Sequence, residues 1–445
     1  MDSPKHDDRK IHRELWHLAL PMMASNLSTP LLGMVDTAVV GHLAHPYYLG
    51  AVALGSTIFS FLYWGFGFLR MGTTGLTAQA YGKNDPLQIN ATLARALLLA
   101  FTLAALLLAL QRPLRDLALQ LLEASPQVQL HTQIYYSIRI LSAPATLANY
   151  VCIGWFIGLQ NTRIPLLLLT LVNLLNILFD YVFVWVLHWQ VAGVALASVA
   201  AEYLGLILGL TLAARHWRRF RRPCRRTILD LQHLGRLFAI NVNLMLRTLL
   251  LLFGFAFFTA QSARLSDVIL AANTILLNLQ SFMAYTLDGF AHAAEAMVGN
   301  ALGRRDIPLL RRTMRSAGLW SAVFAASFSL IYALAGHWIV QLLTSLEPVR
   351  AIAVEFLPFA VILPLISFWS FVLDGVFIGM TRAREMRDVL LVSALLGYLP
   401  SWWWLRSLDN WGLWLAFTGF MTIRTLGMEI QRRRILHRLA ALDEG

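Results

Sequence analysis

Acidic residues lie inside long apolar segments of this chain, where a charge is costly. A carboxylate at the centre of a membrane costs roughly 2.5–3.5 kcal/mol on insertion scales, so each such residue needs a physical reason. Burial favours the neutral form of a carboxyl, and a carboxyl held in this way can be loaded and unloaded by a transmembrane pH difference. These residues therefore predict coupling to an ion gradient. The six acids are Asp36, Asp180, Glu202, Asp288, Glu295 and Asp374.

Two groups of polar residues each share one face of a predicted helix. The faces are Asn173, Asn176 and Asp180 at i, i+3, i+7, and Asp288, His292 and Glu295 at i, i+4, i+7. Lipid would reject both faces, so we expect them to point to a cavity or to the interior of a helix bundle. Each face fits either an ion or substrate site or an interhelical hydrogen-bond clamp. His292 also fits a hydrogen-bonded interior residue, and Glu202 fits a local pair near a seam between the lobes.

Four arginines share the apolar segments with these acids, namely Arg70, Arg139, Arg247 and Arg424. A buried guanidinium needs a counter-charge, whereas one near a helix end can extend to the membrane interface. We expect the four to do one or the other. The sequence does not assign their partners.

The composition is that of a protein that crosses a membrane many times. Hydrophobic residues make up 58% of the 445 residues and charged residues only 13%, against roughly 25% in soluble domains. Each apolar stretch exceeds the ~20 residues that span a bilayer as a helix. The stretches predict an all-α integral membrane protein with twelve transmembrane helices, at about 15–40, 50–80, 91–112, 131–158, 164–187, 190–214, 237–261, 267–301, 314–343, 350–380, 386–406 and 410–431.

The chain repeats itself at an offset of 221 residues. The block Gly154 to Gly158 (GWFIG) returns as Gly375 to Gly379 (GVFIG), and the block Gly82 to Asp85 returns as Gly303 to Asp306. Repeats with an even number of helices have the same orientation in the membrane, which predicts two parallel six-helix lobes related by an axis along the membrane normal. We expect an N-terminal lobe at 1–226, including a basic linker, and a C-terminal lobe at 227–445.

The distribution of positive charge predicts that both termini are cytoplasmic. Of the 36 Lys and Arg, the predicted external segments hold five, at positions 112, 115, 264, 350 and 406, and the helices hold four. The remaining 27 fall on the cytoplasmic side, as the positive-inside rule requires. The densest run, from Arg215 to Arg226, fits a plain topogenic loop or a segment that touches anionic lipid. The net charge of +12 therefore needs no nucleic-acid partner.

Several classes of protein lack support in the sequence. The first apolar segment is too long for a cleavable signal peptide. Two cysteines, Cys152 and Cys224, cannot build a disulfide framework or a metal set. A Walker A motif, an H-E-x-x-H motif and a Gly-rich dinucleotide loop are all missing. We therefore expect no enzyme activity, no catalytic residue, no cofactor and no metal.

Several sequence motifs follow one another along nearly the whole chain. They are Leu20-Pro21-Met22, Leu32 to His42, Leu49 to Gly55, Gly75 to Gly82, and Tyr285 to Gly303. In this order they resemble the multidrug and toxic compound extrusion (MATE) family, and the order carries the resemblance more than any single motif does. Leu69 to Leu76 and the acidic stretch from Tyr285 to Gly303 fit its DinF (DNA-damage-inducible) branch best.

The resemblance implies a V-shaped arrangement of two six-helix lobes, alternating access and cation antiport. The family's cation site in the first lobe matches Asp36, Asn176 and Asp180, and Ser198 stands where many members have Thr. The DinF branch is generally read as proton-coupled, so protons are expected and sodium stays open. The acids that sodium-coupled members carry on the seventh helix are missing from 237–261. A second-lobe cavity would use Asp288, Glu295 and Asp374.

The resemblance also implies a mechanical role for Pro21, because the family's first helix bends near such a proline. Pro21 and Pro30 each remove a backbone donor, although prolines are also tolerated in membrane helices without any such role. The expected substrates are amphipathic or cationic organic compounds, exported by a monomer in contact with the lipids of a bacterial inner membrane. The remaining alternatives are a lipid-linked oligosaccharide flippase of the same superfamily, a major-facilitator transporter and a polytopic membrane enzyme.

Overall fold

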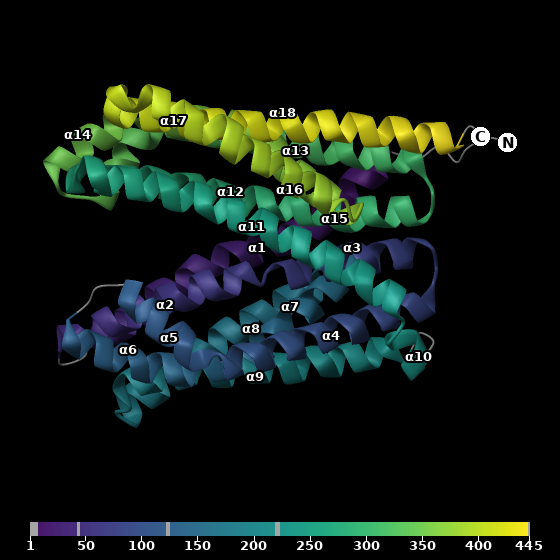
Figure 1. The fold of residues 1–445 in the computed structure, drawn as a ribbon, viewed down its shortest axis with the longest axis horizontal. Helices are drawn as coiled ribbons and strands as arrows, with labels where there is room; N and C mark the ends of the chain where they lie inside the picture. Colours follow the sequence, from purple (N-terminus) through teal and green to yellow (C-terminus); the bar gives the residue numbers. More distant parts are fainter. Residues whose placement is uncertain (1–7, 42–44, 122–124, 219–222, 444–445) are drawn as a thin grey trace. The chain divides into compact units, whose positions relative to one another are not determined.

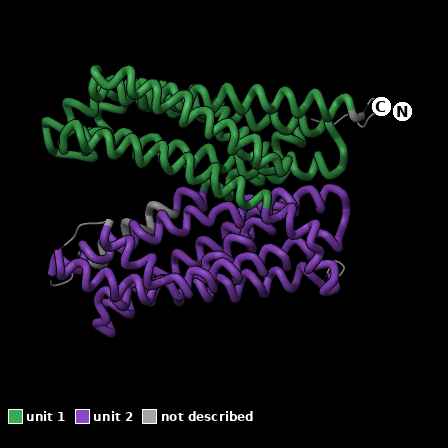
Figure 2. The backbone as a smooth tube through the Cα atoms, in the orientation of Figure 1, with its two compact units in different colours: residues 1–23, 239–445 green, residues 24–238 purple. Residues whose placement is uncertain are grey.

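The chain forms two compact units, residues 24–238 and residues 1–23 together with 239–445 (Figure 2). The computed structural model describes residues 8–41, 45–121, 125–218 and 223–443, with side chains in all of these except 29–41, 121, 442 and 443. In that part of the chain the regular elements are all helices (Figure 1). The division falls inside α1 (Asp8–Gly41), after Met23, and inside α11 (Leu231–Leu265), after Phe238. A lobe boundary at residues 226 and 227 stays a prediction.

The unit of residues 24–238 contains the second part of α1 and the first turns of α11. Its other helices are α2 (Pro46–Gly65), α3 (Phe68–Gly82), α4 (Pro86–Ala109), α5 (Gln111–Leu121), α6 (Pro126–Arg139), the 3-10 helix η1 (Ile140–Ser142), α7 (Ala143–Gly158), α8 (Arg163–Asp180), the π-helix η2 (Tyr181–Val186), α9 (Gln190–Trp217) and α10 (Arg225–Ile228).

The other unit begins with the first part of α1 and continues from α11. Its further elements are α12 (Asp267–Gly303), α13 (Ile307–Leu343), α14 (Glu347–Glu355), α15 (Leu357–Gly379), α16 (Ala383–Val392), the π-helix η3 (Ser393–Tyr398), α17 (Leu399–Leu405), the 3-10 helix η4 (Arg406–Leu408) and α18 (Asp409–Asp443). Aromatic side chains fill its core, with Phe258, Trp414 and Phe417 in mutual contact.

All twelve predicted apolar stretches coincide with helical segments, which confirms the all-α membrane class. Ten segments of the described chain are long and apolar enough to span a membrane. One of them, Ala383–Ala441, contains two of the predicted stretches, and α1 is not among the ten. Several stretches predicted as single helices are interrupted. The breaks follow Gly65 or precede Pro144 and Pro358, where a flexible residue or a missing backbone donor ends the hydrogen-bond ladder.

The backbone repeats at the predicted offset of 221 residues. Six of the non-glycine residues with positive φ form three pairs separated by that offset, in turns that follow corresponding helices, and Gln190 has no such counterpart among the described residues. Asp85 and Asp306 also cap corresponding helices, because their carboxylates accept the backbone N–H three residues later. The pairs with positive φ are Asn84 (52°) and Arg305 (58°), Gln160 (60°) and Thr381 (56°), and His188 (59°) and Asp409 (48°).

Glycines hold two helices in close contact at the same place in both halves. A Cβ on Gly154 would lie 2.3 Å from the backbone oxygen of Arg70, and one on Gly375 would lie 2.0 Å from that of Ala291. No side chain fits at such distances, so α7 can approach α3, and α15 can approach α12, only through glycine. The next turn repeats the contact in the pairs Gly158 with Thr74 and Gly379 with Glu295. The repeated GxFIG motif is therefore a helix-packing motif.

Candidate functional site

The polar face of α8 lies among the helices of its unit. Asn176 donates a hydrogen bond from Nδ2 to Oγ of Ser198 on α9, at 3.1 Å. One turn earlier, Nδ2 of Asn173 donates to Oγ of Ser28 on α1, at 3.0 Å. Asn176 is 2% exposed and Asp180 is fully buried. This face therefore connects α8 to α1 and to α9 through polar contacts inside an apolar bundle.

Asp180 ends the regular part of α8. The next residues, Tyr181 to Val186, form a π-helix, in which Leu187 N–H donates to the carbonyl of Val182. A π-helical segment widens the helix and often marks a functional site. The apolar periodicity of 164–187 gave no sign of this change. The buried carboxyl therefore lies at the point where the helix departs from α-geometry.

Of the four residues predicted to form the cation site, the structure brings Asn176 and Ser198 into contact and places Asp180 on the same face as Asn176. The Asp36 side chain lies outside the described residues, although the helix that carries it, α1, reaches Gly41. An amide, a hydroxyl and a buried carboxyl present the oxygen atoms that a proton or a small cation needs. The complete four-residue site stays a prediction.

A second polar cluster in the same unit contains the remaining acid of the first half. Oε2 of Glu202 accepts a hydrogen bond from Nδ2 of Asn149, at 2.8 Å. Asn149 also donates to the backbone oxygen of Glu202, at 3.0 Å, so it fixes the turn of α9 on which this acid lies. The local pair that was one reading of Glu202 is therefore formed. Asn149 was missed in the sequence because a lone amide in an apolar run carries no pattern.

Arg139, the last residue of α6, contacts side chains of η1 and α2. Its guanidinium donates to Oγ of Ser142 and lies 5.5 Å from the ring centre of Tyr63 and 5.8 Å from that of Phe59. Cation–π contacts of this kind stabilise a guanidinium that has left water. Tyr63 shares a hydrogen bond of 2.9 Å with the same serine hydroxyl. Phe59, Tyr63 and Ser142 were not singled out from the sequence.

In the other unit, the acidic face of α12 contains a close His–carboxyl pair. Nδ1 of His292 lies 3.5 Å from Oε2 of Glu295. Glu295 is fully buried, whereas Asp288 is half-buried. The two readings of this face, a cavity wall and an interhelical clamp, both require such burial. Its participation in a second-lobe cavity stays a prediction.

Asp374 of α15 lies between two guanidinium groups. Its Oδ2 accepts from Arg424 of α18 at 2.5 Å, and Arg247 of α11 forms a second short contact with the same oxygen. The residues are buried, with Arg424 1%, Arg247 6% and Asp374 8% exposed. Asp374 therefore joins three helices through two ion pairs. Its part in a second-lobe cavity stays a prediction.

Comparison with known proteins gives a consistent family. The MatE family model matches residues 21–182 and 244–403, which correspond to the two halves of the repeat. The chain is 46% identical over 425 residues to DNA damage-inducible protein F of Escherichia coli, covering 95% of this chain and 92% of that protein. It is 26% identical to human multidrug and toxin extrusion protein 1, over 94% of this chain and 74% of the human protein.

A solved structure extends the similarity to the fold. The Vibrio cholerae MATE transporter in its bent form superposes with a TM-score of 0.87, over 97% of this chain and 98% of that one, at 20% identity. At this identity the likeness concerns the fold alone. The resemblance inferred from the motifs is confirmed, including its DinF branch. The chain belongs to the MatE family of multidrug and toxic compound extrusion proteins.

Proposed function

We propose that the protein is a secondary active multidrug exporter that exchanges a proton for an amphipathic or cationic organic compound by alternating access. The observation that carries the proposal is the fully buried Asp180, on the same face as the Asn176–Ser198 hydrogen bond. Burial in that position disfavours the ionised carboxylate and favours the neutral acid. A pH difference across the membrane can therefore change the protonation state of this carboxyl. The name of the human relative, multidrug and toxin extrusion protein 1, supports the substrate class.

The second unit favours protons over sodium as the coupling ion. Sodium requires several oxygen ligands that carry net negative charge. Asp374, the acid expected to remain in a second-lobe sodium site, already faces Arg247 and Arg424. Oδ2 of Asp374 is already in contact with both guanidinium groups, and they oppose the binding of a further cation at that oxygen. The proposed coupling site is therefore in residues 24–238, at Asp36, Asn176, Asp180 and Ser198.

The proposal is tested with the purified protein in lipid vesicles. An imposed proton gradient is expected to accelerate the movement of cationic dyes across the vesicle membrane, whereas a sodium gradient of equal size leaves the rate at that of empty vesicles. Dye fluorescence measures the rate for a panel of compounds. Dye movement driven by sodium and insensitive to pH would replace the proton with sodium. Movement of lipid-linked sugar without dye export would favour the flippase alternative.

The orientation of the protein in those vesicles can be read from Cys224, in the proposed cytoplasmic linker. Cys224 is exposed and Cys152 is buried. The Thr227 hydroxyl lies 3.2 Å from Sγ, and its hydrogen bond lowers the pKa of the Cys224 thiol, which favours the reactive thiolate. An impermeant maleimide outside the vesicles should label only copies whose linker faces outward. The same label, applied to spheroplasts and to inverted membranes, tests whether both termini are cytoplasmic in a bacterial inner membrane.

Pro21 is proposed as the hinge of α1. It lies two residues before Met23, where α1 passes from one compact unit to the other. Proline has no N–H for the helical ladder, so bending α1 at this point breaks one hydrogen bond fewer. Pro21→Ala is expected to lower the rate of dye export several-fold and to leave proton binding intact. Stopped-flow export and pH titration of a probe near Leu27 measure the two properties, and an unchanged export rate would remove the hinge from the mechanism.

A further inference from the structure

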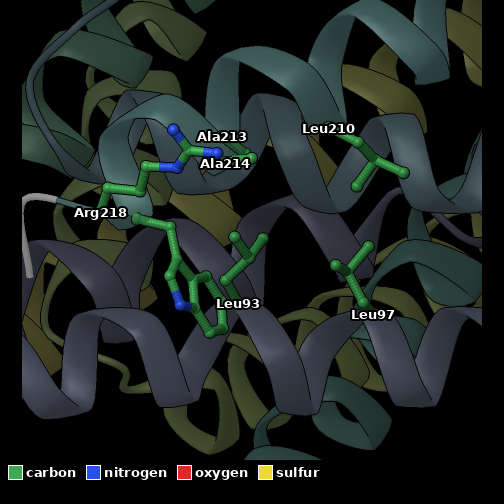
Figure 3. Close-up of a pocket in the computed structure, with 7 residues that line it drawn as sticks. Leu93, Leu97, Leu210, Ala213, Ala214 and Arg218 are labelled. Atoms are coloured by element: carbon green, nitrogen blue, oxygen red, sulfur yellow. The ribbon is translucent and has the colours of Figure 1, made fainter. Parts of the chain in front are cut away.

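An apolar groove lies between α4 and α9 in the unit of residues 24–238 (Figure 3). Leu93 and Leu97 of α4 face Leu210 and Ala213 of α9 across it, and Trp217 and Arg218 lie at its end. The open groove has a volume of about 440 Å³, within the range of roughly 300–1,000 Å³ that is usual for ligand pockets. Its lining is apolar except at that end, where Arg218 supplies a guanidinium.

The groove exists because α4 and α9 both pack on α7. Leu97 and Leu210 rest against Ala145 and Ala148, two fully buried alanines of α7, and against Leu206. Small side chains on the central helix leave room between its two neighbours. Leu97 and Leu210 are themselves only half-buried, so the groove opens to the surface of the unit. An apolar lining of this kind suits a lipid acyl chain.

A hydrogen bond from α4 holds the polar end of the groove in place. Nδ2 of Asn90, in the first turns of α4, donates to the backbone oxygen of Trp217 at 3.2 Å and so fastens the last turn of α9. Arg218 follows directly, is exposed, and forms no side-chain hydrogen bond with the described residues. Tryptophan beside arginine at a helix end is typical of a membrane–water interface.

The short helix α10 is hydrogen-bonded to the same part of α4. Arg95, 3% exposed, donates from Nε to the carbonyl of Ile228 at 3.2 Å and from a terminal nitrogen to that of Thr227 at 2.5 Å. These bonds hold α10 with Arg225 and Arg226 exposed. The arginines on α10 and at the end of α9 therefore belong to segments that α4 positions.

We propose that this groove binds one anionic phospholipid of the cytoplasmic leaflet, with an acyl chain along Leu93, Leu97 and Leu210 and the phosphate at Arg218. The charge argues for this occupant, because a cationic substrate would be repelled by Arg218 and a free anion would leave the apolar lining unused. Each basic residue near an anionic membrane surface contributes roughly 1 kcal/mol, which is about a fivefold change in binding. The inference rests on the proposed cytoplasmic orientation of the linker but not on transport.

The test is native mass spectrometry of delipidated, full-length protein in detergent. Phosphatidylglycerol and phosphatidylcholine with the same acyl chains are added separately. The wild type is expected to retain one phosphatidylglycerol at least fivefold more tightly than phosphatidylcholine. Arg218→Gln should lower phosphatidylglycerol binding about fivefold, and Arg218→Lys should keep most of it. Leu97→Trp, which fills the groove, should lower binding of both lipids.

Matched controls separate the groove from general effects. Arg438→Gln removes an exposed arginine far along the sequence, and Leu98→Trp enlarges the adjacent, exposed residue of α4; neither should change lipid retention. Ala214→Leu is a second groove-filling variant in case Leu97→Trp does not fold. Equal retention of the two lipids by the wild type, or equal losses in Arg218→Gln and Arg438→Gln, would overturn the proposal. Dye export by the same variants reports independently on the proposed function.

Discussion

Asp180→Asn is expected to reduce proton-driven dye export to the rate of empty vesicles while folded protein remains in the membrane. Asparagine has nearly the same shape as the aspartic acid and keeps one oxygen acceptor, but it cannot bind and release a proton. Asp180 is fully buried, so the neutral amide also avoids the desolvation cost of the carboxylate. The variant should therefore be at least as stable as the wild type, and the loss should be one of coupling.

Glu202→Gln provides the matched control. Glu202 is also an acid of a membrane helix in the same unit, but its carboxylate is hydrogen-bonded to Asn149 at 2.8 Å, and glutamine keeps that bond. We expect Glu202→Gln to export dye at a rate within about twofold of the wild type. A change of 1 kcal/mol in the barrier alters a rate about fivefold, so a twofold change corresponds to a smaller energy than that. Undiminished, pH-driven export by Asp180→Asn, or equal losses in both variants, would show that Asp180 does not carry the proton.

The proposed partnership with Asp36 adds a second measurable property. Two carboxyls that lie close together cannot both ionise cheaply, so they titrate as a pair with shared apparent values. Asp36→Asn should then abolish exchange as Asp180→Asn does. Undiminished, pH-driven export by Asp36→Asn would remove Asp36 from the site.

The repeat allowed the most detailed prediction from sequence. Two blocks at one offset predicted two related halves, and the turns after them adopt positive φ at paired positions such as Gln160 and Thr381. This prediction succeeded because the GxFIG motif and the turn that follows it lie close together in the sequence, so one repeated block carries both. Helix locations also followed from apolar length. The interruptions did not, because apolar length alone does not show where the break after Gly65 or the π-helix after Asp180 lies.

The candidate sites were predictable where one helix carries the pattern. Asn176 and Asp180 share a face by spacing alone, and Ser198 was found through the family resemblance. The partners of Arg247 and Arg424 were not predictable, because they join residues 127 and 50 positions apart along the chain. Such pairs depend on how α11, α15 and α18 are packed. The contact of Asn149 with Glu202 and the groove beside the alanines of α7 also depend on how helices distant in the sequence are packed.

Asp374→Asn is expected to cause the largest loss of stability among the polar substitutions. In the wild type, one carboxylate faces two buried guanidinium groups, those of Arg247 and Arg424. Asparagine would leave both positive charges buried without a carboxylate in contact. Removing one partner of a buried ion pair costs about 3–5 kcal/mol. At roughly 2–4 °C per kcal/mol for a unit of this size, the melting temperature should fall by on the order of 10 °C.

The measurement is thermal unfolding of the detergent-purified protein, followed by tryptophan fluorescence. Glu385→Gln is the matched control, because it removes a carboxylate whose pair with Arg382, at 3.4 Å, is partly exposed and contributes about 0–1 kcal/mol. Adding Arg247→Met to Asp374→Asn removes one of the two uncompensated charges and should restore part of the lost stability. Such a recovery would show that the residues interact through their charges. If the two substitutions were independent packing defects, their losses of stability would add instead. If Asp374→Asn instead melts as the wild type does and changes only export, Asp374 acts as a cavity carboxyl rather than as the link between α11, α15 and α18.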